Sequence, residues 1–227
     1  MRLLGKLAVV TGATSGIGAA LARALAKEGA AVVGGGRRAP GAVRRPDAGQ
    51  VALAHLDVTD EAAVKAAFAA LPPPDVVVCC AGTGTFAPLH TASVDDLRAM
   101  LDTHVVGTFL CAREALRRMM PERRGHIVAI ASISADRAFP ECAGYTAAKA
   151  GQRGLMRVLA EEARPYNIRV TTVSPGATDT PIWDDRPGFD RGKMMSADDL
   201  AGLIVAVVAR PMLAIEELTV TPPAGSL

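Results

Sequence analysis

The sequence contains 227 residues, of which 50% are hydrophobic and 21% are charged, a balance typical of a globular protein with a sizeable buried core. Basic residues number 25 and acidic residues 23, which is too even a balance to indicate a nucleic-acid-binding surface. No apolar run reaches the about 18 residues of a membrane span, and Gly5 follows the start too early for a signal peptide. We therefore expect a cytoplasmic protein with one domain, residues 1–227, and with no nucleic-acid or membrane partner.

Apolar runs of strand length alternate with longer amphipathic segments along the chain. The expected strands are residues 7–10, 31–34, 51–56, 75–80, 126–131, 169–174 and 217–220. The expected helices are residues 16–28, 60–71, 94–119, 143–164 and 197–209. Such alternation is typical of a parallel sheet covered by helices on both faces. The predicted fold class is therefore α/β, a three-layer doubly wound Rossmann fold with a seven-stranded parallel sheet.

Local residues mark the ends of some segments and the irregular stretches between them. Gly29 can end the first helix in a left-handed conformation, and Ser196 with Asp199 resembles a capping box at the start of the last helix. Residues 35–50 lack an apolar period and are predicted to form a loop. Residues 178–195 combine proline, glycine and aspartate with large apolar side chains. We interpret them as a flexible substrate lid or, alternatively, as an ordinary surface excursion.

A glycine-rich turn, residues 11–18, lies between the first predicted strand and the first predicted helix. Glycines there permit a tight turn and let the backbone approach a pyrophosphate, which binds at the helix N-terminus. The alternative is that these glycines serve the turn geometry alone. The context between strand and helix favours dinucleotide binding through Gly12, Thr14, Ser15, Gly16, Ile17 and Gly18.

Two arginines follow the second predicted strand, where NAD-binding proteins of this architecture place an acidic residue on the ribose hydroxyls. The sequence there reads Gly34-Gly35-Gly36-Arg37-Arg38. A guanidinium can bind a 2′-phosphate through two hydrogen bonds, and no carboxylate is present to repel the phosphate. The predicted cofactor is therefore NADP(H) in preference to NAD(H), bound through Arg37 and Arg38. The alternative is that both arginines are solvated loop charges.

Tyr145 and Lys149 are four residues apart and therefore share one face of the predicted helix 143–164. A cation beside a phenol favours the phenolate, so the pair predicts a Tyr145 pKa lowered from about 10 and a role in proton transfer. Ser132, at the carboxyl end of a predicted strand, would hold a substrate oxygen against Tyr145. The alternatives are a surface pair for the first two residues and a turn or cap serine for Ser132.

These elements together resemble the short-chain dehydrogenase/reductase family, from about residue 5 to residue 220. TGxxxGIG is matched by residues 11–18, and the family's Ser and YxxxK pattern by Ser132, Tyr145 and Lys149. The resemblance implies that Tyr145 is the acid/base, that Lys149 binds the nicotinamide ribose and tunes Tyr145, and that Ser132 orients the carbonyl. It implies further cofactor contacts from Asp57, Val58, Ala81, Gly82, Pro175, Gly176, Thr178 and Thr180.

Three places depart from the family's pattern. Cys79 and Cys80 replace two asparagines, and thiols substitute poorly for amide hydrogen bonds. His104 stands where the family has a fourth catalytic residue, an asparagine; it could maintain the proton relay and titrate near neutral pH, or be a buried structural histidine. The glycine pair common after the last strand is missing. The cysteines, Cys111 and Cys142 included, are expected to be reduced core residues, with Cys79 and Cys80 on opposite faces of a strand.

The leading hypothesis is an oxidoreductase that transfers a hydride between NADP(H) and a small carbonyl or alcohol. Its predicted catalytic residues are Ser132, Tyr145, Lys149 and His104, with no metal. The alternative is a catalytically impaired dinucleotide-binding sensor or scaffold of the same fold. An epimerase or dehydratase would need an added substrate domain.

Substrate and assembly are less constrained by the sequence. Residues 83–86 and 139–142, with Trp183 and Phe189, predict a moderately apolar, neutral substrate, unless charged neighbours point inward; these are Glu141, Asp184, Asp185 and Arg186. The resemblance implies a homodimer or homotetramer built through helices 94–119 and 143–164.

Overall fold

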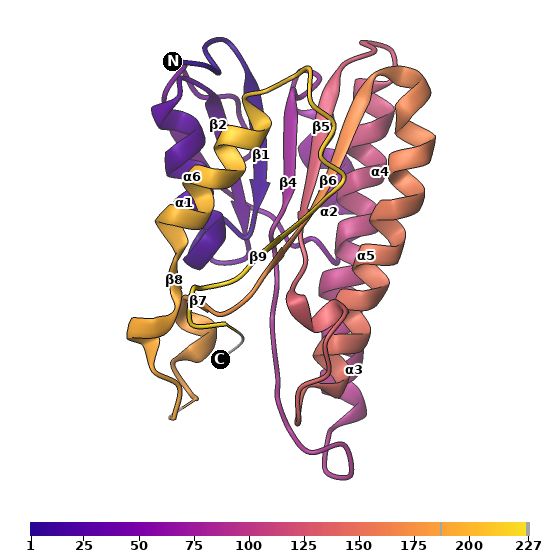
Figure 1. The fold of residues 1–227 in the computed structure, drawn as a ribbon. Helices are drawn as coiled ribbons and strands as arrows, with labels where there is room; N and C mark the ends of the chain where they lie inside the picture. The colour runs from indigo at the N-terminus through magenta and orange to yellow at the C-terminus, as the bar shows by residue number, and fades with distance from the viewer. Residues whose placement is uncertain (187, 226–227) are drawn as a thin grey trace.

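Seven parallel strands form the central sheet, in the order β3-β2-β1-β4-β5-β6-β9 (Figure 1). The computed structural model describes residues 1–186 and 188–225. The strands are β1 (Leu7–Thr11), β2 (Ala31–Gly36), β3 (Val51–His55), β4 (Val76–Cys79), β5 (Gly125–Ile130), β6 (Ile168–Pro175) and β9 (Glu217–Val220). The predicted sheet is confirmed, with strand ends that differ by two residues or fewer.

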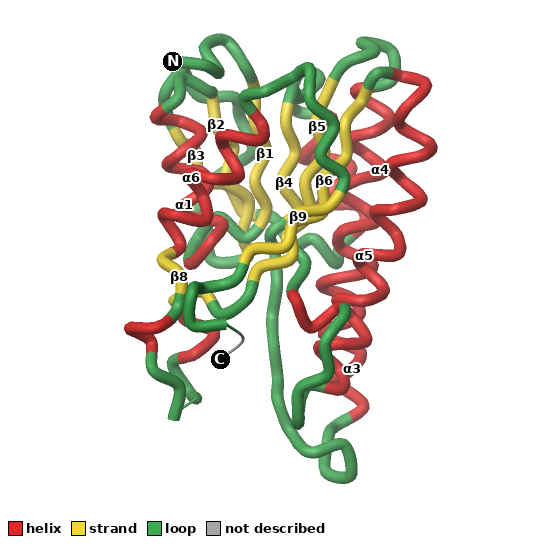
Figure 2. Tube along the Cα trace, viewed as in Figure 1, coloured by secondary structure: helices red, strands yellow, loops and turns green. Residues whose placement is uncertain are grey.

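Helices cover both faces of the sheet, which confirms the predicted three-layer, doubly wound Rossmann arrangement (Figures 1 and 2). On one face lie α1 (Gly16–Lys27) and α6 (Ala197–Val208), which share a hydrophobic cluster with the strands. On the other face lie α2 (Glu61–Ala69), α4 (Gly107–Met119) and α5 (Ala143–Ala163), which share a second cluster. Each helix therefore buries its apolar face against the sheet.

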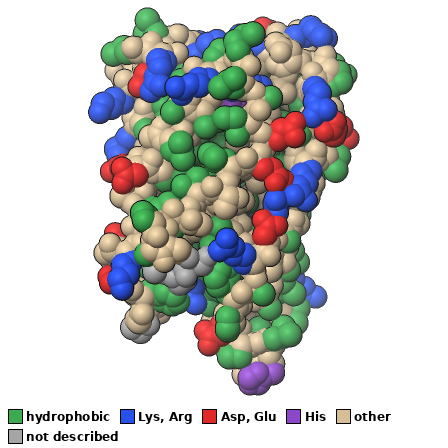
Figure 3. Space-filling view, in the orientation of Figure 1, with side chains coloured by type: hydrophobic (Ala, Val, Ile, Leu, Met, Phe, Trp, Pro, Cys, Tyr) green, Lys and Arg blue, Asp and Glu red, His purple; other side chains and the backbone are tan. Residues whose placement is uncertain are grey.

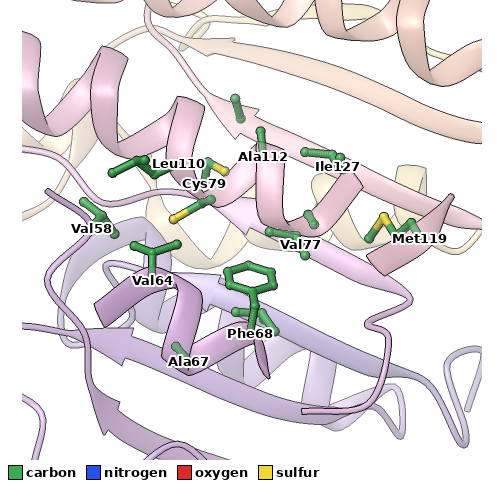
Figure 4. Close-up of a cluster of buried hydrophobic side chains, with 14 of the residues drawn as sticks. Val58, Val64, Ala67, Phe68, Val77, Cys79, Leu110, Ala112, Met119 and Ile127 are labelled. Carbon is green, nitrogen blue, oxygen red and sulfur yellow. The ribbon is translucent and has the colours of Figure 1, made fainter. Parts of the chain in front are cut away.

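The adjacent cysteines at the end of β4 show how the strands divide their side chains between the two clusters. Cys79 is buried in the cluster under α2, α4 and α5, which Figure 4 shows around Phe68, whereas Cys80 packs against the cluster under α1 and α6. Successive strand residues point to opposite faces of a sheet, so the two thiols lie on opposite faces as predicted. All four cysteines are free, and burial raises the pKa of both the Cys79 and the Cys80 thiol to about 12.

Residues 94–119 are helical throughout but do not form the uniform α-helix that the sequence predicts. A π-helical turn, Asp102–Val106, separates α3 (Val94–Leu101) from α4. A Cβ at Gly107 would lie 2.7 Å from Val58 Cγ2, so the absent side chain lets the start of α4 approach the loop after β3. Single π-helical turns are frequent at functional sites, and this one carries the buried His104.

Short elements shape the described part of the segment 178–195, which extends beyond the carboxyl edge of the sheet at the lower left of Figure 1. β7 (Thr178–Asp179) pairs in parallel with β8 (Met195–Ser196), and 3-10 turns form at Pro181–Trp183 and Arg191–Lys193. Ser196 caps α6 as predicted, because its Oγ accepts a hydrogen bond from Asp199 N at 3.0 Å and donates one to Asp199 Oδ2 at 2.7 Å. Residue 187 lies outside the described residues, and the flexibility of the segment stays a prediction.

Charged side chains of both signs are interspersed on the face of the molecule that Figure 3 shows. Gly29 ends α1 with a φ of +95°, the left-handed conformation predicted for it. Within residues 1–186 and 188–225, no helix has both the length and the apolar character that crossing a membrane requires.

The carboxyl ends of the parallel strands all meet at the lower edge of the sheet in Figure 1. This is the edge at which open α/β sheets bind ligands.

Candidate active site

A cleft of about 1160 Å³ lies at the carboxyl edge of the sheet, where the loops after β1, β2, β4, β5 and β6 meet. This volume exceeds the roughly 300–1000 Å³ of a site for one drug-sized ligand. The predicted site residues all line it: Gly12, Thr14, Ser15, Gly16, Ile17, Gly18, Arg37, Arg38, Asp57, Val58, Ala81, Gly82, His104, Ser132, Tyr145, Lys149, Pro175, Gly176, Thr178 and Thr180. Of the predicted substrate-side residues, Thr85 and Asp184 lie outside the lining.

Two glycines of the glycine-rich turn lie where a side chain does not fit. Gly12 has a φ of +69°, and a Cβ there would lie 2.8 Å from Ala81 Cα, while a Cβ at Gly18 would lie 2.2 Å from Gly12 O. The N-cap residue of α1, Ser15, makes no side-chain capping bond, and the first turn of α1 contains no acidic residue. The first N–H groups of α1 therefore face the cleft without a competing carboxylate, an arrangement that fits the pyrophosphate of a dinucleotide.

Thr11, at the end of β1, links two central strands, a role that the sequence patterns did not predict. Its Oγ1 accepts hydrogen bonds from Cys80 N and Ala81 N, both at 3.0 Å, and donates to Val78 O at 3.4 Å. These bonds tie the end of β1 to β4 and to the residues that follow it. The sequence feature that could have predicted this role is a threonine that begins the glycine motif at the end of a buried strand.

The two arginines after β2 extend along the adenosine end of the cleft. Arg38 Nη2 lies 3.4 Å from Ser15 Oγ, which brings its guanidinium to the glycine-rich turn. Asp57 Oδ1 accepts hydrogen bonds from Thr59 N at 3.0 Å and Thr59 Oγ1 at 2.8 Å. Burial acts to raise the pKa of Asp57, but these bonds and the charge of Arg37 outweigh it and hold the pKa below its ordinary value. Asp57 is therefore a carboxylate, able to accept from an amine.

The opposite end of the cleft begins where β6 ends. Gly176 N donates to Val220 O at 2.7 Å, and Thr178 Oγ1 donates to Gly176 O at 3.1 Å. A Cβ on Gly16 would lie 3.2 Å from the Cβ of Thr180. The segment that begins at Thr178 therefore crosses over the N-terminus of α1, so that one ligand can touch both.

Ser132 combines the two roles that the sequence left open. It is the N-cap of the 3-10 turn Ile133–Ala135, where its Oγ accepts a hydrogen bond from Ser134 N at 3.1 Å. The hydroxyl also makes a side-chain hydrogen bond with Tyr145, which acts to lower the tyrosine pKa. The cap therefore fixes the hydroxyl in place next to the phenol.

Lys149 is held by a buried chain of polar groups that the sequence patterns did not reveal. Its Nζ donates to Ile130 O at 2.7 Å and to Gln152 Oε1 at 3.1 Å, and Gln152 Nε2 donates to Thr108 Oγ1 at 2.8 Å. Gln152 is fully buried, one helical turn after Lys149 on α5. Burial lowers the pKa of Lys149 to about 8, so its ammonium can lose a proton close to neutral pH.

The predicted lowering of the Tyr145 pKa is wrong for this structure. Burial raises that pKa to about 12 and outweighs the hydrogen bond with Ser132. Lys149 Nζ lies 5.7 Å from the centroid of the tyrosine ring and is directed at the carbonyl and amide oxygens named above. Desolvation therefore dominates the phenol, which is protonated at neutral pH.

The predicted titration of His104 near neutral pH is also wrong. Burial, followed by the positive charge of Lys149, lowers the His104 pKa to about 3. Its Nε2 lies 2.6 Å from Thr83 O, and its ring meets the Tyr145 ring edge-on with centroids 5.5 Å apart. Nδ1 is buried and has no hydrogen-bond partner among the residues that the structure describes. His104 is therefore a neutral imidazole that fixes the loop after β4.

Sequence and structure comparisons identify the family. The pattern of short chain dehydrogenases matches residues 6–188, which is more than half of the chain. The chain belongs to the short-chain dehydrogenase/reductase family. Its relatives include the cis-4-hydroxycyclohexanecarboxylate dehydrogenase of Sinomonas cyclohexanicum, which is 41% identical over 208 residues, 87% of this chain and 83% of the relative. The glycine betaine reductase of Emericella nidulans is 33% identical over 97% of this chain, which spans only 19% of that longer protein.

Solved short-chain dehydrogenases share the architecture. An alcohol dehydrogenase from the archaeon Thermococcus sibiricus, complexed with 5-hydroxy-NADP, superposes with a TM-score of 0.82 at 27% identity, covering 95% of each chain. As a short-chain dehydrogenase/reductase, the chain is an oxidoreductase that binds a nicotinamide dinucleotide and acts on an alcohol or carbonyl group. The residues Ser132, Tyr145 and Lys149 line this cleft together, and their catalytic role stays a prediction.

Proposed function

We propose that this short-chain dehydrogenase transfers a hydride between NADP(H) and the carbonyl or alcohol of a small molecule. The convergence of Ser132, Tyr145 and Lys149 in one cleft with the glycine-rich turn supports the proposal most directly. When bound, the nicotinamide supplies or accepts the hydride. Residues 1–227 act as one domain in this proposal, because a single sheet carries both ends of the cleft.

Each catalytic side chain has a role that follows from its surroundings. Tyr145, with a pKa of about 12, is a phenol that can donate a proton to the substrate oxygen. Ser132, fixed by its bond to Ser134 N, holds that oxygen against the phenol. Lys149 binds the nicotinamide ribose and, with a pKa of about 8, can replace the proton that Tyr145 loses. His104 is assigned a positioning role as a neutral residue bound to Thr83 O.

The proposed preference for NADP(H) rests on Arg37 and Arg38, which line the cleft directly after β2. A charge-assisted pair of hydrogen bonds to a 2′-phosphate corresponds to about a 10- to 100-fold difference in affinity. We expect Arg37→Ala to weaken NADPH binding by that factor and to leave NADH binding unchanged. Titration of both cofactors by calorimetry measures this difference. An unchanged NADPH affinity would remove Arg37 from the proposal.

The relative that is named for cis-4-hydroxycyclohexanecarboxylate supports a small ring alcohol or ketone as substrate. Turnover is tested by following NADPH absorbance with a panel of ketones, aldehydes, quinones and 3-oxoacyl thioesters that includes 4-oxocyclohexanecarboxylate. The Tyr145→Phe variant is the control, and activity that persists in it would refute the proposed mechanism. NADPH binding without turnover of any compound would favour a sensor or scaffold instead.

Assembly of two or four copies through the helical residues 94–119 and 143–164 is part of the proposal. Val106, Phe109 and Val158 are 40%, 44% and 58% exposed in these helical segments, and exposed large apolar side chains are available for a protein contact. Light scattering measures the oligomeric state, and a monomer at micromolar concentration would contradict this part. Location in the cytoplasm stays a prediction.

A further inference from the structure

Arg186 lies among three aromatic rings on the substrate side of the cleft. Its guanidinium carbon is 3.9 Å from the centroid of the Phe86 ring, 5.0 Å from that of the Phe189 ring, and 5.3 Å from that of the Trp183 ring. The Trp183 and Phe189 rings lie 4.7 Å apart, and Trp183 Nε1 donates to Thr178 O at 3.0 Å. Packing against these rings therefore fixes the position of the Arg186 cation.

The neighbouring acidic residues do not neutralise this cation. Within the described residues, no carboxylate oxygen lies within the 4.0 Å of an ion pair with Arg186. Arg191 instead forms ion pairs with two aspartates of the same segment, with Asp179 at 2.5 Å and with Asp184 at 2.7 Å. Glu141 and Asp185 also line the cleft, but both are exposed to solvent, whereas Arg186 is half-buried. A partly desolvated guanidinium without a carboxylate gains free energy when a ligand supplies one.

The cation is also close to the candidate catalytic residues. The Phe86 ring that stacks on Arg186 has its centroid 5.5 Å from that of the Tyr145 ring. The guanidinium carbon therefore lies at most about 9.4 Å from the Tyr145 centroid, the sum of the two distances. The Cys142 thiol, three residues before Tyr145, makes a side-chain hydrogen bond with Arg186. One small molecule can thus reach both the phenol and the guanidinium.

We propose that Arg186 binds a carboxylate on the substrate while Ser132 and Tyr145 hold the oxygen that is reduced or formed. The substrate class is then a compact hydroxy or oxo acid with an apolar body, which replaces the neutral substrate that the sequence predicts. The rings of Phe86, Trp183 and Phe189 surround the guanidinium carbon, and the N–H groups of a guanidinium can bind both oxygens of a carboxylate. This assignment rests on the proposed function, because it names the substrate of the same site.

The binding of a carboxylate can be measured without turnover. Trp183 is the single tryptophan of the chain, and its ring lies 5.3 Å from the Arg186 guanidinium carbon, so its fluorescence reports on ligands there. The probes are cyclohexanecarboxylate and its neutral analogue cyclohexanecarboxamide, titrated with and without saturating NADP⁺. We expect the carboxylate to bind about 10- to 100-fold more tightly than the carboxamide, and Arg186→Gln to abolish this preference.

Arg191→Gln is the matched control, because Arg191 belongs to the same segment but is already paired with two aspartates. It should retain the preference for the carboxylate. Equal affinities of the two probes for the unaltered protein would overturn the assignment, whether or not the variants fold, and so would tighter binding of inorganic phosphate than of cyclohexanecarboxylate. Failure of the proposed function is distinguishable, since loss of all turnover leaves this titration unaffected.

Discussion

Replacing Lys149 with methionine should change how the stability of the protein depends on pH. Lys149 is 4% exposed, and burial lowers its pKa from 10.5 to about 8. Between these values the unfolded chain binds more protons than the folded chain, so the free energy of unfolding rises with pH. Burial of the charged Lys149 lowers the free energy of unfolding by its full amount below about pH 8, and this loss disappears as the pH rises toward 10.5.

The size of the effect follows from the same two pKa values. One pKa unit corresponds to 1.36 kcal/mol, so the full penalty is about 3 kcal/mol. Roughly 2 kcal/mol of it is recovered between about pH 7 and pH 9.5. Lys149→Met also leaves Ile130 O and Gln152 Oε1 without their donor, but that cost does not vary with pH. The unaltered protein should therefore gain about 2 kcal/mol relative to the variant over this range.

Urea unfolding followed by circular dichroism at several pH values measures this difference. Lys27→Met is the control, because Lys27 is an exposed lysine in the last turn of α1 and should give a curve parallel to that of the unaltered protein. If Lys149→Met also gives a parallel curve, the charge of Lys149 is not desolvated and the argument from burial fails.

Four further substitutions test the fold and the site. Gly18→Ala would place a Cβ 2.2 Å from Gly12 O, and we expect at least a tenfold loss of cofactor affinity by calorimetry. Gly202 lies in open space on α6, so Gly202→Ala should instead raise the free energy of unfolding by about 0.5–1 kcal/mol. Phe68→Ala, in the buried cluster of Figure 4, should lower the free energy of unfolding by about 3–5 kcal/mol in urea titrations; a loss below about 1 kcal/mol would show that the cluster is not packed as described. Because the His104 pKa is about 3, the profile of kcat/KM against pH for His104→Asn should keep its shape between about pH 6 and 8, and a limb lost there would contradict a neutral imidazole.

The sequence alone determined the features that depend on local geometry. The alternation of apolar runs predicted the strands and helices, because each has its own side-chain period. The spacing of Tyr145 and Lys149 placed both on one face of α5, and the glycines at 12 and 18 marked a turn in which a Cβ does not fit. The π-helical turn at Asp102–Val106 was not predicted, because the apolar pattern does not distinguish a π-helical turn from the α-helix around it. The close approach of the following residue, Gly107, to Val58 involves a residue far away in the sequence.

Only the tertiary structure decided the electrostatics of the site. The pKa values of Tyr145, Lys149 and His104 follow from burial, and burial depends on segments that the spacing of neighbours does not reveal. In the same way, the sequence leaves open whether Arg186 points into the site. The fold decides this by bringing the Phe86 ring, from a distant part of the chain, to 3.9 Å from the guanidinium carbon. The order of residues in the sequence determines which side chains are available, whereas desolvation and long-range packing determine their pKa values and their partners.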